Sequence, residues 1–259
     1  MCSVTDVGKA QLLVAHPGHE LLLHAWICRT KPVVHVLTDG SGHSNASRLD
    51  ASAKLLREAG ARPGVIFGRL SDRQAYAMIL ERNMTLLLSL VMELAEELRR
   101  EQPIMIVIDA AETYNPVHDL SRLIAGAAIE MANVDTKQYE YAVVNSPYSF
   151  DSAHDDVIAF DLDDAAHAAK IEQARLLASL IPDADDLLSR FGTEAYRREA
   201  LRRVLDWAHI DTDSPALYEQ FGEQRLAAHR YQHVIRRAEH MIPLRDALLD
   251  EVRKHACVF

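Results

Sequence analysis

Several features that mark whole classes of proteins are missing or scarce in this chain of 259 residues. It has three cysteines, Cys2, Cys28 and Cys257, which are odd in number and widely spaced. This distribution argues against a disulfide framework and favours a reducing compartment. No run of about 18 or more apolar residues occurs, so we expect no membrane-spanning helix. The first residues also lack the basic region of a signal peptide, and we therefore predict a cytoplasmic location.

An excess of basic residues is absent as well. The chain has 28 lysines and arginines against 38 aspartates and glutamates, which gives a formal net charge of −10. Nucleic-acid binding is not expected, because contacts to phosphates need a basic surface. No internal repeat, low-complexity segment or Gly/Ser linker is evident. A small-molecule substrate is therefore the expected partner, and a homo-oligomer is possible.

The chain does contain short apolar runs that alternate with amphipathic stretches, and 49% of its residues are hydrophobic. This alternation predicts an α/β fold with a Rossmann-like, doubly wound and mostly parallel sheet. Residues 1–182 are predicted to form this domain, and 183–259, rich in Arg, Glu and Leu, a helical extension packed on the core. The expected strands are 11–15, 33–37, 64–67, 104–108 and 139–145, and the expected helices are 20–30, 47–59, 73–101, 118–132 and 163–180.

Two histidines follow the first expected strand, in the sequence His16-Pro17-Gly18-His19-Glu20. They lie in a strand-to-helix turn, and ligand sites in α/β sheets gather at the carboxyl ends of strands. Neutral imidazole is also the commonest metal ligand among side chains. Two histidines at this spacing are common by chance, so the pair alone is a weak signal.

A third histidine occupies the corresponding position after the strand at 104–108. The turn Asn115-Pro116 follows that strand, and His118 begins the next expected helix. The side chains of His16, His19 and His118 are therefore expected to converge at one edge of the sheet. Three protein ligands and an open fourth position are typical of a catalytic zinc site.

With these motifs the chain resembles the LmbE/PIG-L family of zinc-dependent N-deacetylases. The first motif of that family is A-H-P-D-D-E after a strand, where residues 15–20 read A-H-P-G-H-E. The second is H-P-D-H or a variant before a helix, where residues 115–118 read N-P-V-H. Residues 37–40, L-T-D-G, resemble its L-T-x-G, and the helix around Lys170 resembles its late K-x-x-A helix. The similarity covers roughly residues 10 to 180.

The resemblance implies a zinc-dependent amidohydrolase that removes an N-acyl group, such as acetyl, from a small amide. An amino sugar, a cyclitol or an intermediate of specialised metabolism would fit as substrate. It further implies one Zn²⁺ per chain, although iron or another divalent metal is possible. By the same resemblance, Arg48 and Asp72 would bind substrate near the metal. Tyr114 and Tyr148 lie on loops after expected strands and are candidates for contacts with a sugar-like substrate.

The departures from the family pattern concern catalysis directly. In the family the first Asp of D-D is the general base and the second is a zinc ligand. Gly18 replaces the base here, and His19 replaces the ligand, which would give a three-histidine site. Another group must then move the proton. We rank Asp119 and Asp39 first, although Asp119 is equally explained as a first-turn helix carboxylate favoured by the helix dipole. The other candidates are Asp109, Glu112 and Glu20.

Two other functions remain open at this point. Three histidines without the base Asp would also suit another C–N or ester hydrolysis, or a redox metal. Alternatively, Gly18 marks a non-catalytic binding member that kept the fold. Residues 231–236, which include His233, and the pair Glu239-His240 could line a pocket floor, although histidines on amphipathic helices usually lie at the surface.

Overall fold

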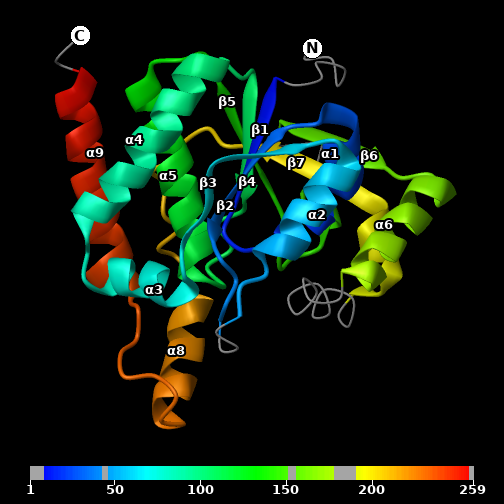
Figure 1. The fold of residues 1–259 in the computed structure, drawn as a ribbon. Coiled ribbons are helices and arrows are strands. Elements are labelled where there is room, and N and C mark those ends of the chain that lie inside the picture. The colour runs from blue at the N-terminus through cyan, green and yellow to red at the C-terminus, as the bar shows by residue number, and fades with distance from the viewer. Residues whose placement is uncertain (1–8, 43–45, 151–155, 178–190, 257–259) are drawn as a thin grey trace.

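The structure, a computed structural model, describes residues 9–42, 46–150, 156–177 and 191–256. Within these residues, seven strands form one mixed sheet in the order β3-β2-β1-β4-β5-β7-β6 (Figure 1). The first five strands pair in parallel, and β7 is antiparallel to both β5 and β6. The strands are β1 Ala10–Val14, β2 Val33–Thr38, β3 Arg62–Leu70, β4 Met105–Asp109, β5 Lys137–Tyr141, β6 Val157–Asp161 and β7 Arg198–Arg203.

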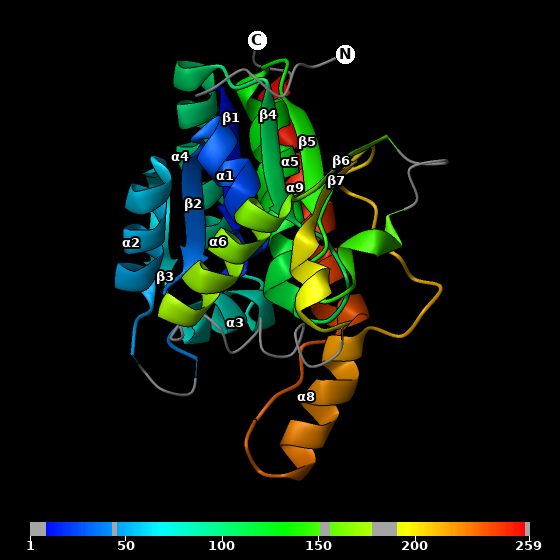
Figure 2. The ribbon, with the colours of Figure 1, turned by 90° about the vertical axis from the view of Figure 1, so that its right-hand side faces the viewer.

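Helices cover both faces of the sheet (Figure 2). One face carries α1 (His24–Thr30), α2 (Leu49–Ala59) and α6 (Asp164–Leu176). The other carries α4 (Met84–Glu101), α5 (Pro116–Ala132) and α9 (Ile242–Ala256). Helices α3 (Asp72–Leu80) and α8 (Leu217–Ala227) lie beyond the carboxyl ends of the parallel strands.

The two faces have separate apolar cores because side chains alternate along a strand. In β1, Leu13 joins the core beneath α4, α5 and α9, whereas Leu12 and Val14 join the core beneath α1 and α2. In the part of the chain that the structure describes, no helix has the length and apolarity to cross a bilayer. Cys28 is a free, exposed thiol.

The α/β architecture and all five expected strands are confirmed, but the single helix expected at 73–101 is wrong. The chain leaves α3 at Leu80 and starts α4 at Met84. Arg82 takes a left-handed φ of 51°, and Asn83 caps the new helix by accepting the N–H of Leu86 at 3.1 Å. Asparagine competes with helical bonding in this way and favours caps over helix interiors. The helix expected at 163–180 ends at Leu176, and residues 178–180 lie outside the described residues.

The segment 183–259, expected to be almost entirely helical, contains a strand as well as helices α8 and α9 among its described residues. Residues 198–203 form β7, which inserts between β5 and β6, with Arg202 opposite Glu140 and Ala200 opposite Ala159. Strand β6 was not predicted. A segment rich in Arg, Glu and Leu has good helix propensity, but pairing on both sides and burial of its middle residues decide its structure here.

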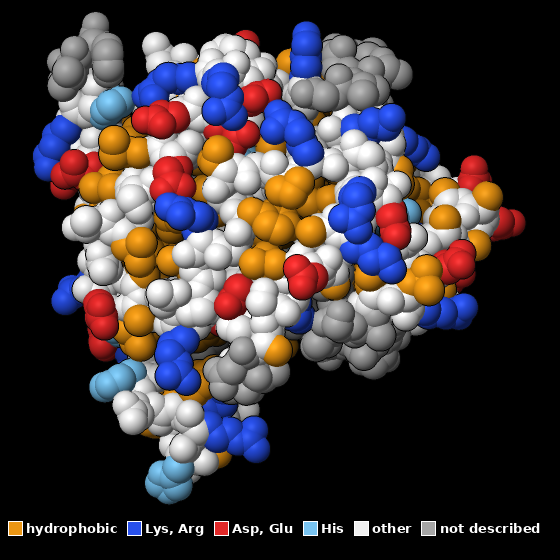
Figure 3. Space-filling model, viewed as in Figure 1, with side chains coloured by type: hydrophobic (Ala, Val, Ile, Leu, Met, Phe, Trp, Pro, Cys, Tyr) orange, Lys and Arg blue, Asp and Glu red, His pale blue; other side chains and the backbone are white. Residues whose placement is uncertain are grey.

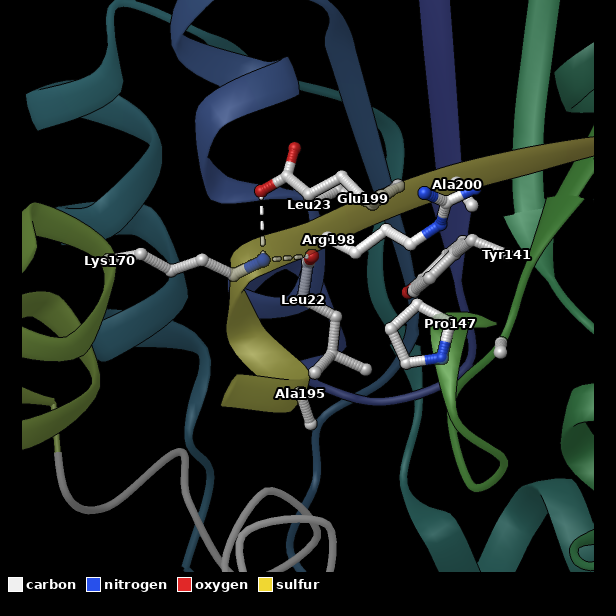
Figure 4. Close-up of a pocket in the computed structure, with 10 residues that line it drawn as sticks. Leu22, Leu23, Tyr141, Pro147, Lys170, Ala195, Arg198, Glu199 and Ala200 are labelled. Atoms are coloured by element: carbon white, nitrogen blue, oxygen red, sulfur yellow. Dashed lines mark hydrogen bonds and ion pairs between the residues drawn. The ribbon is translucent and has the colours of Figure 1, made fainter. Parts of the chain in front are cut away.

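A buried ion pair ties β7 to the helices in front of it. Lys170 Nζ of α6 lies 2.9 Å from Glu199 Oε1 of β7, and the two side chains are 1% and 0% exposed (Figure 4). Lys170 also donates to the carbonyl of Leu22 at 2.6 Å. The Glu199 carboxylate accepts the backbone N–H groups of Ala25 and Trp26 at 3.0 and 2.7 Å. Both charges therefore have several partners without water.

Candidate metal centre and adjoining cleft

The site is built where the sheet changes its winding direction. From β1 the chain proceeds to β2 and β3 on one side, and from β4 to β5 on the other, so the carboxyl ends of β1 and β4 flank a crevice. His16 and His19 follow β1, and His19 opens a short 3₁₀ helix, η1 (His19–Leu23). His118 lies in the first turn of α5, which begins at Pro116 after the cap Asn115.

The structure brings the three predicted histidines together. The ring centroids are 5.3 Å apart for His16 and His19, 5.5 Å for His16 and His118, and 4.8 Å for His19 and His118. All three are buried. His19, Asp109 and His118 each offer a ligand atom, and these atoms lie within 4.8 Å of one another. Two imidazoles and a carboxylate suit a divalent transition metal.

Asp109 fixes the orientation of His19. Its Oδ2 lies 2.7 Å from His19 Nδ1 and also accepts the N–H of Ala15 at 2.8 Å, while Oδ1 accepts the hydroxyl of Tyr141 at 2.7 Å. Burial alone would raise the pKa of Asp109, but the charge and hydrogen bond of His19 outweigh it and lower the pKa to about 2. An ionised carboxylate on Nδ1 leaves Nε2 as the ligand atom of the ring. Asp109, one of the lesser candidates for the base, thus has a positioning role.

His16 has a similar partner on the same ring nitrogen. Its Nδ1 lies 3.0 Å from Asp72 Oδ1 and 2.9 Å from Thr38 Oγ1. Burial would raise the pKa of Asp72, but the hydrogen bond and charge of His16 hold it well below its usual range. On the other side of the ring, Asn115 Nδ2 lies 3.1 Å from His16 Nε2. His16 can therefore bind a metal through Nε2 only when the Asn115 amide turns away.

Gly18, between the two histidines, has a backbone conformation that favours glycine. Its φ is 113° and its ψ −26°, in the left-handed region that L-residues with a side chain rarely adopt. Its N–H donates to Glu20 Oε2 at 2.8 Å, and this bond closes the turn that carries His19. Glycine at this position is thus required by the turn between the two histidines.

Placing an aspartate at position 18 is expected to destabilise the fold for this reason. Gly18→Asp should lower the free energy of unfolding by about 1–3 kcal/mol, the typical cost of holding a residue with a side chain in such a conformation. Urea unfolding monitored by circular dichroism measures this difference. Gly18→Ala is the comparison variant, because it adds only a methyl group at the same positive φ, and a similar loss of stability there would assign the effect to the backbone conformation. A Gly18→Asp variant as stable as the parent protein would contradict the argument.

The carboxylates considered as replacement bases have different surroundings. Glu20 bonds the Gly18 N–H and the Ser52 hydroxyl. Glu112 accepts the backbone N–H groups of residues 143, 144 and 145. Both therefore hold backbone segments in place. Their engagement leaves Asp39 and Asp119 as the candidates for proton transfer.

Asp39 and Asp119, the two remaining candidates for proton transfer, have different surroundings. Asp39 Oδ1 accepts the N–H of Ser41 at 2.9 Å, and Asp39 is not among the residues that line either of the clefts described below. Asp119 is buried, and burial raises its pKa to about 7 despite the backbone N–H of Thr113 and the nearby charges of Arg122 and Arg237. Neither carboxylate is tied into a network as extensive as that of Asp109.

A cleft of about 540 Å³ opens beside His16, between α3 and the segment that follows α8. A second cavity of about 390 Å³ shares part of its wall and includes Tyr114. Arg48 and Asp72, both predicted to bind substrate, line the first cleft, as does the predicted stretch 231–233. The ring of Tyr148 instead lies 5.1 Å from the Arg198 guanidinium and is 53% exposed. The shared wall consists of Tyr76, Asn115, Arg225, Tyr231 and His233.

Several lining residues were not anticipated from the sequence. Asn115 was noted only as part of an Asn-Pro turn, although a polar residue just before His118 was itself a usable signal. Tyr76 and the arginines of α3 and α8 had the pattern of ordinary helix surfaces. The C-terminal segment reaches the site loop directly, because the N–H of Tyr218 bonds the carbonyl of Thr113 at 2.9 Å.

The positioning role of Asp109 can be tested by a near-isosteric change. Asp109→Asn removes the charge behind His19 and is expected to weaken metal binding about 10–100-fold, as is typical when the partner of a metal-binding histidine is altered. Competition against a chromophoric chelator measures the affinity. Asp39→Asn is the control and should leave metal affinity unchanged. Equal affinities for Asp109→Asn and the parent would show that His19 does not need this carboxylate.

The chain thus combines an α/β fold with a buried histidine–carboxylate cluster beside a cleft, an arrangement typical of metal-dependent enzymes. Its sequence matches no family model and no curated protein. Its structure is similar to that of the antimicrobial A40926 pseudoaglycone deacetylase, with a TM-score of 0.52 and 14% identity over 79% of this chain and 100% of that one. A deacetylase triple mutant of teicoplanin biosynthesis gives a TM-score of 0.53 and 13% identity, over 80% and 100% of the chains. The fold expected from the motif resemblance is therefore confirmed.

Proposed function

We propose that this chain is a metal-dependent hydrolase that removes an N-acyl group, such as acetyl, from a small amide. The observation that carries the proposal is the buried cluster of His16, His19, His118 and Asp109, of which His16 lines a substrate-sized cleft. The fold shared with deacetylases supports the same reaction class. A bound divalent metal, for which we propose one Zn²⁺ per chain, would polarise the acyl carbonyl and make water more acidic.

The side chains of the site have distinct roles in this proposal. His16, His19 and His118 hold the metal, and the carboxylates of Asp72 and Asp109 keep the Nδ1 atoms of the first two occupied so that Nε2 faces the metal. Arg48 and Tyr114 line the space in which the substrate lies.

Proton transfer belongs to Asp119 or Asp39. The Asn variants of these two residues separate the candidates, because removal of the true base should lower kcat by about 10²–10⁴-fold at unchanged metal content. Parallel loss in both variants would assign the step to a relay between them. No loss in either would place the base elsewhere.

The reaction is tested by acyl release. The purified, untagged protein is analysed for metal, loaded with zinc and incubated with N-acetylated amino sugars and cyclitols, and free acetate and amine are quantified by mass spectrometry. We expect release that stops on chelation and returns with zinc. Iron or copper in the protein would instead favour another metalloenzyme reaction with the same histidines. Absence of any metal after reconstitution would favour a binding protein.

We also predict a cytoplasmic location and propose that the chain can form a homo-oligomer.

A further inference from the structure

We propose that the substrate carries an anionic group, a carboxylate or a phosphate, and that four arginines of the cleft bind it, one before α2, one in α3, one in α8 and one in the segment after α8. The inference rests on the proposed function for the position of the scissile amide. Its own basis is the charge of the cleft. The four arginines concerned, which we call the arginine cluster, are Arg48, Arg73, Arg225 and Arg230.

The cleft is basic although the chain is acidic. All four members of the arginine cluster line it, whereas Asp72 is the one carboxylate among its described lining residues. Asp72 is already engaged, because its two oxygens bond His16 Nδ1 at 3.0 Å and the N–H of Gly42 at 2.6 Å. In a chain of net charge −10, this local excess of positive charge would concentrate an anion beside the metal centre.

Several guanidinium N–H groups of the arginine cluster have no acceptor within the described residues. Within the described residues, the side chains of Arg73 and Arg230 have neither an ion pair nor a hydrogen bond. Arg48 uses Nε to donate to the carbonyl of Gly40 at 2.7 Å, while its buried Nη1 has no hydrogen-bond partner. Buried donors are rarely left without an acceptor. An anionic group in the cleft would supply the missing acceptor, and a guanidinium matches the oxygens of carboxylate or phosphate.

A neighbouring arginine outside the cleft differs from these arginines, because it has carboxylate partners. Arg236 lies close to three carboxylates, those of Glu219, Glu223 and Glu239. Arg236, which does not line the cleft, thus has carboxylate partners, whereas Arg225 and Arg230, which line it, have none within the described residues. Figure 3 shows arginine (blue) and histidine (pale blue) side chains on the projection that α8 and the following segment form.

Aromatic contacts hold this segment against α3. The rings of Tyr76 and Tyr231 are 6.3 Å apart and meet edge to face. Arg225 donates to the Tyr231 hydroxyl at 2.6 Å, with its guanidinium carbon 5.3 Å from the ring centroid. Arg225 is thereby positioned without losing its charge, and Tyr231 offers a surface for the uncharged body of the substrate. One cleft of about 540 Å³ thus joins His16 to the arginine cluster, a size suited to a single small molecule.

The test is a binding comparison on chelator-treated protein, so that it does not depend on catalysis. The probes are N-acetylglucosamine, N-acetylglucosamine 1-phosphate and N-acetylmuramate, which share the acetamide and differ in having no charge, a phosphate or a carboxylate. Isothermal titration calorimetry is expected to give at least about tenfold tighter binding for one or both anionic probes. Which of them binds more tightly identifies the anion. The advantage should shrink as salt rises, because the cluster is partly exposed.

Variants then assign the effect to the cluster. Arg73→Ala/Arg230→Ala removes two side chains without protein partners, so the fold should be unaffected and the anionic advantage should fall at least about tenfold. The matched control is Arg57→Ala/Arg175→Ala, which removes the same charge from exposed positions on α2 and α6 and should change nothing. Equal affinity for the neutral and anionic probes, no measurable binding of either anion, or an advantage that survives in Arg73→Ala/Arg230→Ala would overturn the proposal. Anion binding without acyl release in the metal-loaded protein would instead count against the proposed function alone.

Discussion

Replacing His118 by alanine is expected to leave the protein with roughly a tenth or less of the metal bound by the parent chain, and to lower acyl release by about 10³-fold or more. His118 belongs to the tightest group of potential ligands, and its ring centroid lies 4.8 Å from that of His19. Loss of one of three protein ligands removes most of the affinity of such a site. Elemental analysis after dialysis, together with urea unfolding, separates metal loss from unfolding.

The control and the companion variants define the ligand set. His209→Ala removes an exposed histidine far from the cluster and should retain the full metal content. His16→Ala decides between two geometries, because His16 is bonded to Asn115 in the structure while Asp109 lies within the group of ligand atoms. Metal loss in His16→Ala supports the three-histidine site. Full metal in both His16→Ala and His118→Ala would place the metal elsewhere.

The second large effect is expected on stability. Lys170→Met removes one partner of the buried pair and should lower the free energy of unfolding by about 3–5 kcal/mol, because Glu199 would remain as an uncompensated charge. Burial lowers the pKa of Lys170, whereas the charge and hydrogen bond of Glu199 raise it. The loss is measured by urea unfolding, as a shift of the midpoint at constant slope.

A second variant and a surface control show whether the charge itself is responsible. Lys170→Met/Glu199→Gln removes both charges and should recover part of the stability, since the amide oxygen can still accept a backbone N–H. Lys54→Met breaks the exposed pair with Glu58, in which both side chains are more than 40% exposed, and should cost less than about 1 kcal/mol. A Lys170→Met protein that unfolds like the parent would mean that Glu199 is solvated after all.

Sequence periodicity predicted the parts of the fold that local patterns determine. The apolar runs before His16 and before Asp109 gave β1 and β4, and with them the edge of the sheet at which the three histidines meet. The break at Asn83 was readable in principle, because asparagine is a preferred N-cap. Strand β7 was not readable, because its pairing with β5 and β6 depends on partners far away in the chain.

The same distinction applies to the site. Histidine spacing and the strand ends predicted which rings converge. The roles of Asp109 and Asp72 behind those rings, and of Arg73 and Arg230 in the cleft, depend on how distant elements pack, which no local pattern contains. Gly18 resembled a loss of catalytic function in the sequence alone, and its φ of 113° gives it a structural reason.

The position of β7 in the sheet has a consequence for the newly made protein. The strand begins at Arg198, whereas its neighbours β5 and β6 end at Tyr141 and Asp161. At a synthesis rate of about 5–20 residues per second, roughly 3 to 11 seconds separate the completion of β5 from the start of β7. During that interval β5 presents an open hydrogen-bonding edge, and Lys170 emerges before Glu199 exists. At this stage the exposed edge of β5 could pair with a strand of another chain. A chaperone bound to the nascent chain would prevent such pairing until β7, which ends at Arg203, has been synthesised.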